Sequence, residues 1–329
     1  MNFSAVPKVE LHVHLESSLS FAAVSRIDPA VTLQDYQHDF VAPAKCTNLA
    51  DYLERAPKGI TLMQTEEELR LVTADVFEQF QRDNVLYAEI RFVPFVHTRK
   101  GLSAEKVVEI VEDEAVKASQ ATGIEARLIP ATLRHFSAEQ SLQTVKLVEH
   151  FLGTRVAGVD LGASEAGFPI FAHISAFQYA AQKGIPRTAH AGETRGAESV
   201  WEVLKCFGPS RIAHGVRSIE DPALIEHLRK EDIHLELCPT SNVQIDIYET
   251  YADHPIHRLY KSGVSLSVNT DTRMLANVTL TQEYERLHET FGWDEKDFLQ
   301  CNLHAVRAAF APEDVKRRLE KQLREGYGL

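Results

Sequence analysis

The run VELHVHL at residues 9–15 is the first of a series of short apolar stretches that decide the fold. Most of these stretches are continuously apolar rather than alternating, as is typical of parallel strands that are covered on both faces. The predicted strands are residues 9–15, 85–93, 126–132, 156–161, 186–190, 211–214, 233–238 and 264–269. Eight strands separated by helical segments are what a closed (β/α)8 barrel requires, so we predict an α/β fold of the TIM barrel type.

Signals for helix starts lie between the predicted strands. Residues 65–68 (TEEE) and 137–140 (SAEQ) have the pattern of a capping box, and Asp221 precedes a proline at the first helical position. The segment between the first two strands is much longer than the others, and two further helical runs begin at Asp294 and Pro312. We therefore expect extra helices after the first strand and at the C-terminus.

The long segment after the first predicted strand is expected to cover one end of the barrel. Its apolar residues are expected to form a lid there, so that shortening the segment would weaken substrate binding. These residues are Phe40, Leu49, Leu53, Leu62 and Met63.

Composition narrows the class of protein. The 329 residues are 44% hydrophobic and 25% charged, so the chain can bury a large core. The sequence contains no run of about 18 or more apolar residues for a membrane span, and its N-terminus does not resemble a secretory leader. The formal net charge of −12 argues against a nucleic-acid partner. No linker or repeat divides the sequence, so we expect residues 1–329 to form one domain.

The four cysteines are far apart in the sequence and form no C-x-x-C pair. A chain of this length needs no disulfides for stability, so we expect reduced thiols and a cytoplasmic location. The expected partner is a small-molecule substrate, without nucleic acid or membrane. The sequence leaves the oligomeric state open.

His12 and His14 lie two residues apart on the first predicted strand. Residues at this spacing face the same side of a strand, so both imidazoles can point at one metal ion. The pair alone is equally compatible with two hydrogen-bonded histidines that line the barrel.

Polar residues also occur where other predicted strands end. His190 closes the fifth strand, His214 closes the sixth, and Asp271 follows the eighth. Because the C-terminal strand ends of a barrel meet at one mouth, we expect these groups to converge with the first pair. Histidines and a carboxylate form a nitrogen and oxygen site suited to Zn²⁺. The competing interpretation is a set of unrelated polar residues at loop starts.

Two further features narrow the kind of metal site. Residues 159–165 (VDLGASE) contain no lysine, whereas binuclear barrel hydrolases commonly bridge two metals through a modified lysine at the fourth strand end. One metal ion is therefore expected. Cys238 and Pro239 do not supply P-C-x-x-C spacing, which excludes the zinc site of the cytidine deaminases.

Five motifs occur in order along the chain. They are PKVELHVHL (residues 7–15), HAGE (190–193), HGVR (214–217), LELCPTSN (235–242) and VNTD (268–271). Together they resemble the adenosine/adenine deaminase branch of the amidohydrolase superfamily, and most closely the bacterial adenosine deaminases. The similarity runs the whole length of the chain.

The resemblance implies a ligand set for one Zn²⁺ ion per chain. His12, His14, His190 and Asp271 would hold the ion and leave a place for water. Zinc lowers the pKa of such a water towards about 7, which makes hydroxide available at neutral pH.

The resemblance also implies three catalytic residues. Asp271 would accept the proton of the water, and His214 would hydrogen-bond the hydroxide as it attacks C6 of a purine. Glu193 would be the general acid that protonates ring N1, a role for which burial should raise its pKa. A helix-start carboxylate favoured by the helix dipole is the structural alternative for Glu193.

Three positions depart from the family pattern, and all concern substrate recognition. Glu16 stands where nucleoside deaminases have an Asp that reaches the ribose 5′-hydroxyl. Ala163 stands where a glycine amide faces purine N3, and Thr272 where a second acidic residue contacts N7. With His14, these residues are the implied substrate contacts.

The run CPTSNVQ at residues 238–244 looks more like the enzymes that act on nucleosides than like those that act on free bases. We therefore expect hydrolysis of adenosine and 2′-deoxyadenosine to inosine and 2′-deoxyinosine plus ammonia. The alternative substrates are adenine or a modified 6-aminopurine nucleoside such as aminodeoxyfutalosine. Two other classes are another mononuclear amidohydrolase, acting on a ring amide, a pterin or a pyrimidine, and a non-enzymatic descendant, which predicts a missing ligand or acid.

Overall fold

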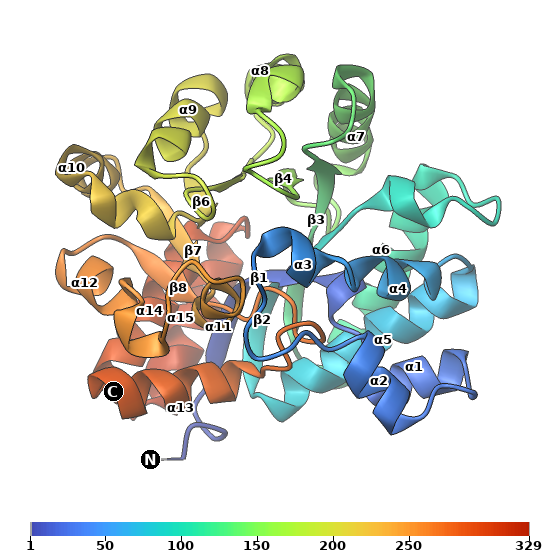
Figure 1. Ribbon diagram of the computed structural model, residues 1–329, viewed down its shortest axis with the longest axis horizontal. Coiled ribbons are helices and arrows are strands. Elements are labelled where there is room, and N and C mark those ends of the chain that lie inside the picture. The colour runs from blue at the N-terminus through green and yellow to red at the C-terminus, as the bar shows by residue number, and fades with distance from the viewer. Residues whose placement is uncertain (1, 329) are drawn as a thin grey trace.

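Eight parallel strands form the centre of the molecule (Figure 1) in the computed structural model, which describes residues 2–328. The first four strands pair in chain order as one sheet: β1 (Lys8–His14), β2 (Val85–Phe92), β3 (Glu125–Leu133) and β4 (Asp160–Gly162). The last four pair in the same way: β5 (His190–Ala191), β6 (Arg211–His214), β7 (His234–Leu237) and β8 (Leu266–Val268). Each of the eight predicted strands is present.

Two seams join these sheets into a barrel. At one seam, Val159 donates its N–H to the carbonyl of Pro186 at 3.0 Å. At the other, His14 donates its N–H to Asp271 O at 2.8 Å, and Asp271 donates its N–H to His12 O at 3.0 Å. The fold is therefore the predicted (β/α)8 barrel.

Strands β4 and β5 are shorter than the sequence predicts. Near the predicted starts of both strands, residues pair only through isolated bridges, Val156 with Leu128 and Leu152, and Arg187 with Val159. Pro186, the first residue of the predicted fifth strand, has no N–H to give to a ladder, and regular pairing begins only at His190.

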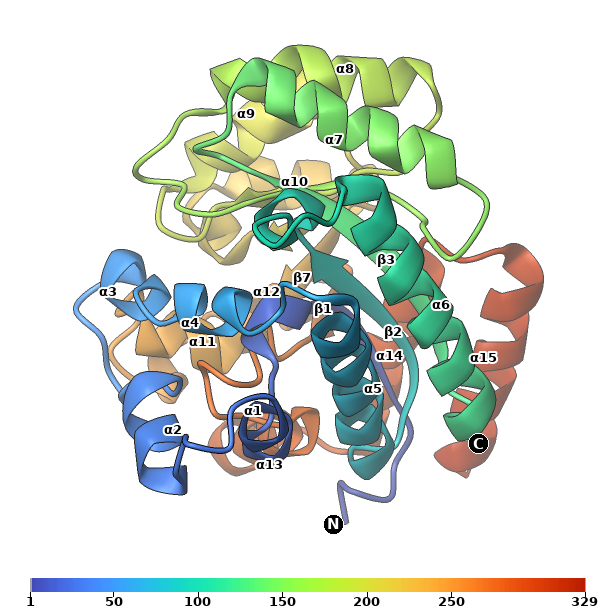
Figure 2. The same cartoon turned by 90° about the vertical axis from the view of Figure 1, so that its right-hand side faces the viewer.

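Helices cover the outside of the barrel (Figures 1 and 2). Helix α5 (Glu66–Arg82) begins after the capping box of Thr65, and α7 (Ala138–Phe151) after that of Ser137, as predicted. The other helices between strands are α6 (Ala104–Thr122), α8 (Ile174–Gln182), α9 (Ala197–Phe207), α10 (Pro222–Lys230), α11 (Pro239–Gln244) and α12 (Ile256–Lys261). The short 3-10 turns are η1 (Leu15–Ser17), η2 (Pro94–His97), η3 (Ile170–His173), η4 (Val216–Glu220) and η5 (Tyr251–Asp253).

The extra helices lie where the sequence predicts them. After β1 the chain forms α1 (Phe21–Ile27), α2 (Leu33–Asp39), α3 (Leu49–Leu53) and α4 (Ala56–Thr61). After β8 it forms α13 (Leu280–Phe291), α14 (Glu295–Ala308) and α15 (Glu313–Gly326). Figure 2 shows α3 and α4 on one side of the strands and α14 and α15 on the other. None of the helices within residues 2–328 is long and apolar enough to cross a bilayer.

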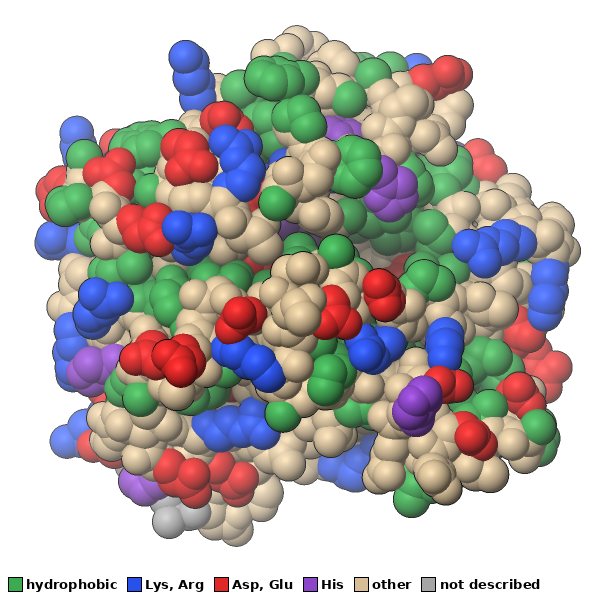
Figure 3. Space-filling model, in the orientation of Figure 1, with side chains coloured by type: hydrophobic (Ala, Val, Ile, Leu, Met, Phe, Trp, Pro, Cys, Tyr) green, Lys and Arg blue, Asp and Glu red, His purple; other side chains and the backbone are tan. Residues whose placement is uncertain are grey.

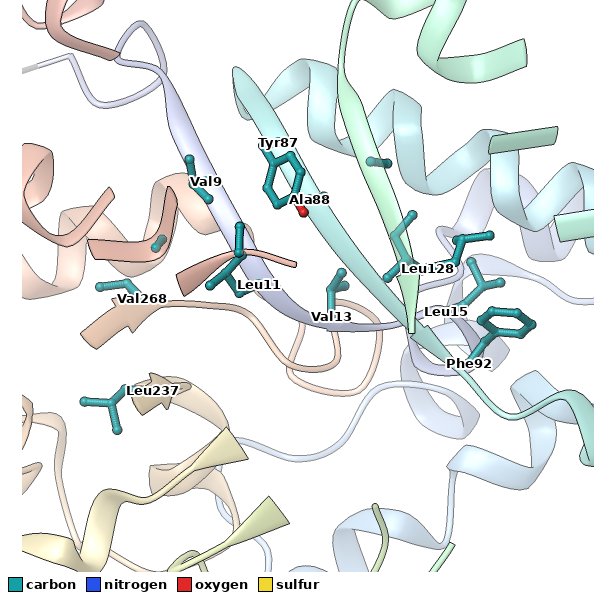
Figure 4. Packing of buried hydrophobic residues seen from close by; sticks show 14 of the residues in the cluster. Val9, Leu11, Val13, Leu15, Tyr87, Ala88, Phe92, Leu128, Leu237 and Val268 are labelled. Carbon is teal, nitrogen blue, oxygen red and sulfur yellow. The ribbon is translucent and has the colours of Figure 1, made fainter. Parts of the chain in front are cut away.

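The first strand is irregular, and its polar side chains face two ways. Val9, Leu11 and Val13 pack among the apolar side chains of the core (Figure 4). The register with β2 shifts between Glu10 and Val13, so simple alternation does not hold there.

Glu10 accepts a hydrogen bond from Arg273 at 2.6 Å, and Arg273 lies over the ring of Phe80 on α5, outside the barrel. His12 faces the barrel interior, where its Nδ1 lies 3.2 Å from Glu236 Oε2.

Paired charges fill the barrel beneath its mouth. Arg91 Nε lies 3.2 Å from Asp160 Oδ2, and Arg211 Nε lies 2.9 Å from Glu236 Oε1. Arg91 also contacts Glu236, and all four side chains are fully buried. Buried charges are costly unless they are paired, so this network holds its members in fixed positions.

Candidate metal centre and active site

The four predicted metal ligands converge at the mouth of the barrel. The Nε2 atom of His14 lies 3.2 Å from that of His12 and 3.2 Å from that of His190. Asp271 Oδ1 lies 3.3 Å from His12 Nε2 and 3.4 Å from His14 Nε2. Ligands of a tetrahedral zinc ion with bonds of about 2.0–2.1 Å lie about 3.3 Å apart, so these spacings fit one such ion.

A fifth group, His214 at the end of β6, belongs to the same cluster. Donor atoms of four buried residues lie within 4.8 Å of one another, and these residues are His12, His190, His214 and Asp271. Together with His14, they make five candidate ligands, whereas a tetrahedral ion has only four ligands.

The outer nitrogens of two of these histidines face hydrogen-bond acceptors. His12 Nδ1 lies 3.2 Å from Glu236 Oε2. His190 Nδ1 lies 3.1 Å from Asp160 Oδ2 and 3.1 Å from Leu161 O. Each Nδ1 therefore carries the ring hydrogen, and each Nε2 points a lone pair into the cluster. This arrangement, in which buried carboxylates orient histidines towards one point, is typical of a metal site.

The two carboxylates behind the histidines are held in the charged form. Burial by itself raises the pKa of Glu236, but Arg91 and Arg211 outweigh it and hold that pKa well below its usual range. For Asp160, burial is outweighed by His190 and Arg91, and its pKa is also well below the usual range. Both groups therefore remain acceptors for the outer nitrogens.

Glu193 and His214 lie side by side at the mouth, with Glu193 Oε1 3.4 Å from His214 Nε2. Burial, followed by the charges of Asp271 and Glu165, raises the pKa of Glu193 well above its usual value. This shift favours the protonated acid, the form that can donate a proton. Burial and the charge of His12 lower the pKa of His214 well below its usual value, which favours the neutral ring.

A cavity of about 260 Å³ opens at these residues. The polar groups of the cluster that line it are His14, His190, Glu193, His214 and Asp271. None of the residues that line it within the described part of the chain is Lys or Arg. Figure 3 shows a hollow in this face of the molecule, with hydrophobic and histidine side chains along its rim.

Two of the five residues expected to form a lid line this cavity. Leu49 and Leu53 of α3 do so, together with Ile60 of α4. The remaining three pack with the hydrophobic core instead, and these are Phe40, Leu62 and Met63. The cover over the cavity is therefore formed by α3 and α4, not by the whole insertion.

The four residues implied as substrate contacts all line the cavity, and these are His14, Glu16, Ala163 and Thr272. Glu16 Oε1 accepts the N–H of Val93 at 2.5 Å and lies 3.0 Å from His97 Nε2. Ala163 has a φ of +75°, in the left-handed region that favours glycine.

Three residues of the site escape prediction from sequence. His97 contacts Glu16, His135 lines the cavity, and the hydroxyl of Tyr52 hydrogen-bonds that of Thr272. The two histidines follow the ends of β2 and β3, so the same strand-end argument could have found them. Tyr52 lies on an inserted helix, and no signal in the sequence separates it from a core tyrosine.

Glu165 holds the loop that carries Glu193. Its buried carboxylate accepts four consecutive backbone N–H groups: Gly192 at 2.8 Å, Glu193 at 3.0 Å, Thr194 at 3.0 Å and Arg195 at 3.1 Å. Hydrogen bonds to a charged acceptor are stronger than neutral ones, so this carboxylate fixes the backbone on both sides of Glu193.

Comparisons with known proteins agree with this arrangement. The family model described as adenosine deaminase matches residues 7–326. An adenosine deaminase of Clostridium perfringens is 32% identical over 327 residues, which cover 97% of this chain and 98% of that protein. The solved adenine deaminase from Arthrobacter aurescens has a TM-score of 0.90 at 26% identity and covers 98% of this chain and 100% of its own. A Burkholderia ambifaria amidohydrolase with bound Zn has a TM-score of 0.89 at 23% identity, covering 99% of this chain and 92% of its own.

Proposed function

This chain belongs to the adenosine deaminase family of metal-dependent hydrolases, and on that premise we propose that it deaminates adenosine and 2′-deoxyadenosine. The products are inosine, 2′-deoxyinosine and ammonia. The observation that carries this proposal is the cluster of imidazole and carboxylate groups beside Glu193 in one cavity. The identity of 32% with an adenosine deaminase supports a nucleoside as the substrate.

One Zn²⁺ ion per chain is held by four residues, and these are His12, His14, His190 and Asp271. Their mutual spacings of 3.2 to 3.4 Å and the inward lone pairs of His12 and His190 support this set. Zinc, when bound, supplies a water whose pKa is lowered to about 7, and thus a nucleophile at neutral pH.

Three side chains move or hold protons during the reaction. Asp271 accepts the proton of the attacking water, and His214 hydrogen-bonds the oxygen of that water. Glu193 donates a proton to ring N1, so that the ring accepts an electron pair while the C6–O bond forms. The C6–N bond then breaks, and the amino group leaves as ammonia with the proton that Asp271 took. As the C6 carbonyl of the product forms, the remaining proton of the new hydroxyl returns to the enzyme and restores the protonated form of Glu193.

The charges around the cavity favour an uncharged substrate. Recognition of a phosphate normally uses Arg or Lys, and neither is among the described residues that line the cavity. The carboxyl groups of Glu16, Glu193 and Asp271 line it instead. A base or nucleoside is therefore favoured over a nucleotide.

The contacts to the substrate come from His14, Glu16, Ala163 and Thr272. Adenine is a second candidate substrate, because an adenine deaminase with 26% identity covers nearly the whole chain and has the same fold. A modified 6-aminopurine nucleoside such as aminodeoxyfutalosine is a further alternative. An ultraviolet assay of zinc-loaded protein with adenosine, 2′-deoxyadenosine and adenine separates these substrates, and turnover of none of them would contradict the proposed function.

The substitution Glu193→Gln tests the proton donor. Because glutamine cannot donate a proton to N1, kcat should fall by about 10²–10⁴-fold, the usual contribution of a general acid. Zinc content and the urea midpoint of unfolding should stay close to those of the wild type.

The matched control is Glu198→Gln, which changes an exposed glutamate close by in the sequence. It should retain full turnover. A Glu193→Gln protein that keeps both zinc and full activity would exclude the acid role.

A single domain comprising residues 1–329 is part of the proposal. Within the described residues it is supported by α14, which packs on β1 and β8, and by α4, which packs on η1 directly after β1. A cytoplasmic location remains the prediction made from the cysteine pattern.

A further inference from the structure

A chain of three hydrogen bonds runs from the backbone to His214. The N–H of Ile256 donates to His254 Nδ1 at 3.2 Å. His254 Nε2 lies 3.2 Å from Asn242 Oδ1, and Asn242 Nδ2 lies 3.3 Å from His214 Nδ1. All three side chains are buried, with exposed fractions of 2% or less.

The direction of each bond follows from its first member. A backbone N–H is always a donor, so His254 Nδ1 is an acceptor and the ring hydrogen must lie on Nε2. His254 Nε2 therefore donates to the oxygen of Asn242. The amide nitrogen of Asn242 then donates to His214 Nδ1, which leaves the hydrogen of His214 on Nε2.

The opposite orientation of the Asn242 amide is inconsistent with these contacts. With the amide reversed, its nitrogen would donate to His254 Nε2 while the backbone donates to Nδ1. A neutral imidazole has only one nitrogen that can accept, so it cannot accept both bonds. Burial lowers the pKa of His254 to about 3, which keeps this ring neutral.

We infer that Asn242 and His254 are positioning residues that fix His214 in the tautomer with hydrogen on Nε2. This inference rests on the proposed function for its catalytic consequence. The Nε2 atom of His214 faces the cluster and carries a hydrogen, so it is a hydrogen-bond donor and has no lone pair for a metal. Of the five groups at the mouth, His214 is thus the one that is not a ligand, and His14 completes the set.

The substitution Asn242→Asp reverses the last bond. A carboxylate only accepts hydrogen bonds, so it forces the hydrogen of His214 onto Nδ1 and leaves a lone pair on Nε2. A wrong histidine tautomer costs about 10⁴ in kcat in the serine-protease triad. By the same reasoning we expect kcat of the zinc-loaded variant to fall by at least about 100-fold, with KM changed less than kcat.

The tautomer also has a readout that does not depend on turnover. In protein loaded with Co²⁺ in place of zinc, the new lone pair of His214 becomes a ligand, and the visible absorption of the cobalt should weaken and shift as the coordination number rises. An Asn242→Asp protein with a wild-type cobalt spectrum and wild-type kcat overturns the inference. If the wild type deaminates no purine but the spectrum shifts as expected, the proposed function fails and the tautomer assignment stands.

If the Asn242→Asp protein does not fold, substitutions of His254 test the same positioning role. His254→Gln retains an N–H donor for Asn242 Oδ1 and should keep kcat within about tenfold of wild type. His254→Leu removes the donor and should lower kcat by more than tenfold.

The matched control is His234→Leu, which removes a buried histidine that contacts Ser265 and Ser267 and not Asn242. It should lower the urea midpoint and leave the cobalt spectrum unchanged. Equal kcat in the Gln and Leu variants of His254 contradicts the positioning role.

Discussion

At or just after the C-terminal ends of the strands, three of the described non-glycine residues have a left-handed backbone. They are Ala163 after β4, His214 at the end of β6 and Asp271 after β8, with φ values of +75°, +61° and +64°. Such conformations cost on the order of 1–3 kcal/mol each and tend to cluster at active sites. Here the turn redirects His214 and Asp271 towards the mouth, so backbone strain is part of how the cluster is assembled.

Replacing Ala163 by glycine should relieve backbone strain at a position where, unlike at His214 and Asp271, the turn does not orient a functional side chain. Glycine adopts a φ of +75° without a penalty from Cβ, so Ala163→Gly should raise the free energy of unfolding by about 1 kcal/mol, as measured by urea denaturation. Ala189→Gly is the control, because Ala189 is buried and is not among the residues with positive φ. That variant should lose about 1 kcal/mol. A loss of stability in both variants would show that Ala163 is not strained.

Single residues differ in how far the sequence predicts their place. His12, His14, His190, His214 and Asp271 could be predicted because each lies close to the end of a predicted strand, and the C-terminal strand ends meet at one mouth. Glu165 also follows a strand, but its structural role is to accept hydrogen bonds from four backbone N–H groups of another loop. Contacts of that kind depend on how separate loops pack, which no local pattern encodes.

Helix α4 lies close to the 3-10 turn η1 because Gly59 has no side chain. A Cβ at this position would lie 2.3 Å from the carbonyl oxygen of Glu16. Neither backbone segment can move away without shifting the whole helix α4 or the whole turn η1. This glycine therefore sets the distance between the cover of the cavity and the turn that carries Glu16.

The substitution Gly59→Ala should move α4 away from η1. We expect KM for the purine to rise by about tenfold, and the free energy of unfolding to fall by about 1–3 kcal/mol, as is usual for an overpacked contact. Thr61→Ala, an exposed change on the same helix, is the control and should leave both quantities unchanged. Unchanged KM in the Gly59→Ala protein would show that α4 does not cover the bound substrate.

The helices and strands themselves could largely be predicted. The capping boxes at Thr65 and Ser137 begin the helices expected of them, because a cap is a local interaction. For β5, Pro186 is a signal in the sequence against regular pairing at the start of the predicted strand. The short length of β4 could not be predicted, because it depends on how residues 156–159 pair with the neighbouring strands. For the same reason, the sequence does not tell which apolar residues of the insertion face the cavity and which face the core.

The proposed ion joins the two sheets of the barrel. His12 and His14 come from the first sheet, whereas His190 and Asp271 come from the second or follow it. A ligand that binds only the folded chain stabilises it by mass action. We therefore expect the metal to support the whole barrel as well as the reaction.

Removal of the metal should lower stability as well as activity. Treatment with dipicolinate should remove the metal and lower the free energy of unfolding measured in urea. When zinc is added back above its dissociation constant, this free energy should rise by about 1.4 kcal/mol for each tenfold increase in free zinc. His190→Ala should lose this dependence, and His38→Ala, an exposed histidine, should keep it. If wild-type stability does not change with zinc, these residues do not hold the ion in the folded state.

The seam between β1 and the residues after β8 also sets an order of events in the cell. His12 and His14 leave the ribosome long before Asp271, which bonds to their backbones. Nascent chains begin to fold from the N-terminus, but here the first strand must wait for its last neighbour. The barrel therefore closes, and the proposed metal site is completed, only after Asp271 has been synthesised. Translation products that end between His14 and His190 would carry two histidines of the site without the rest.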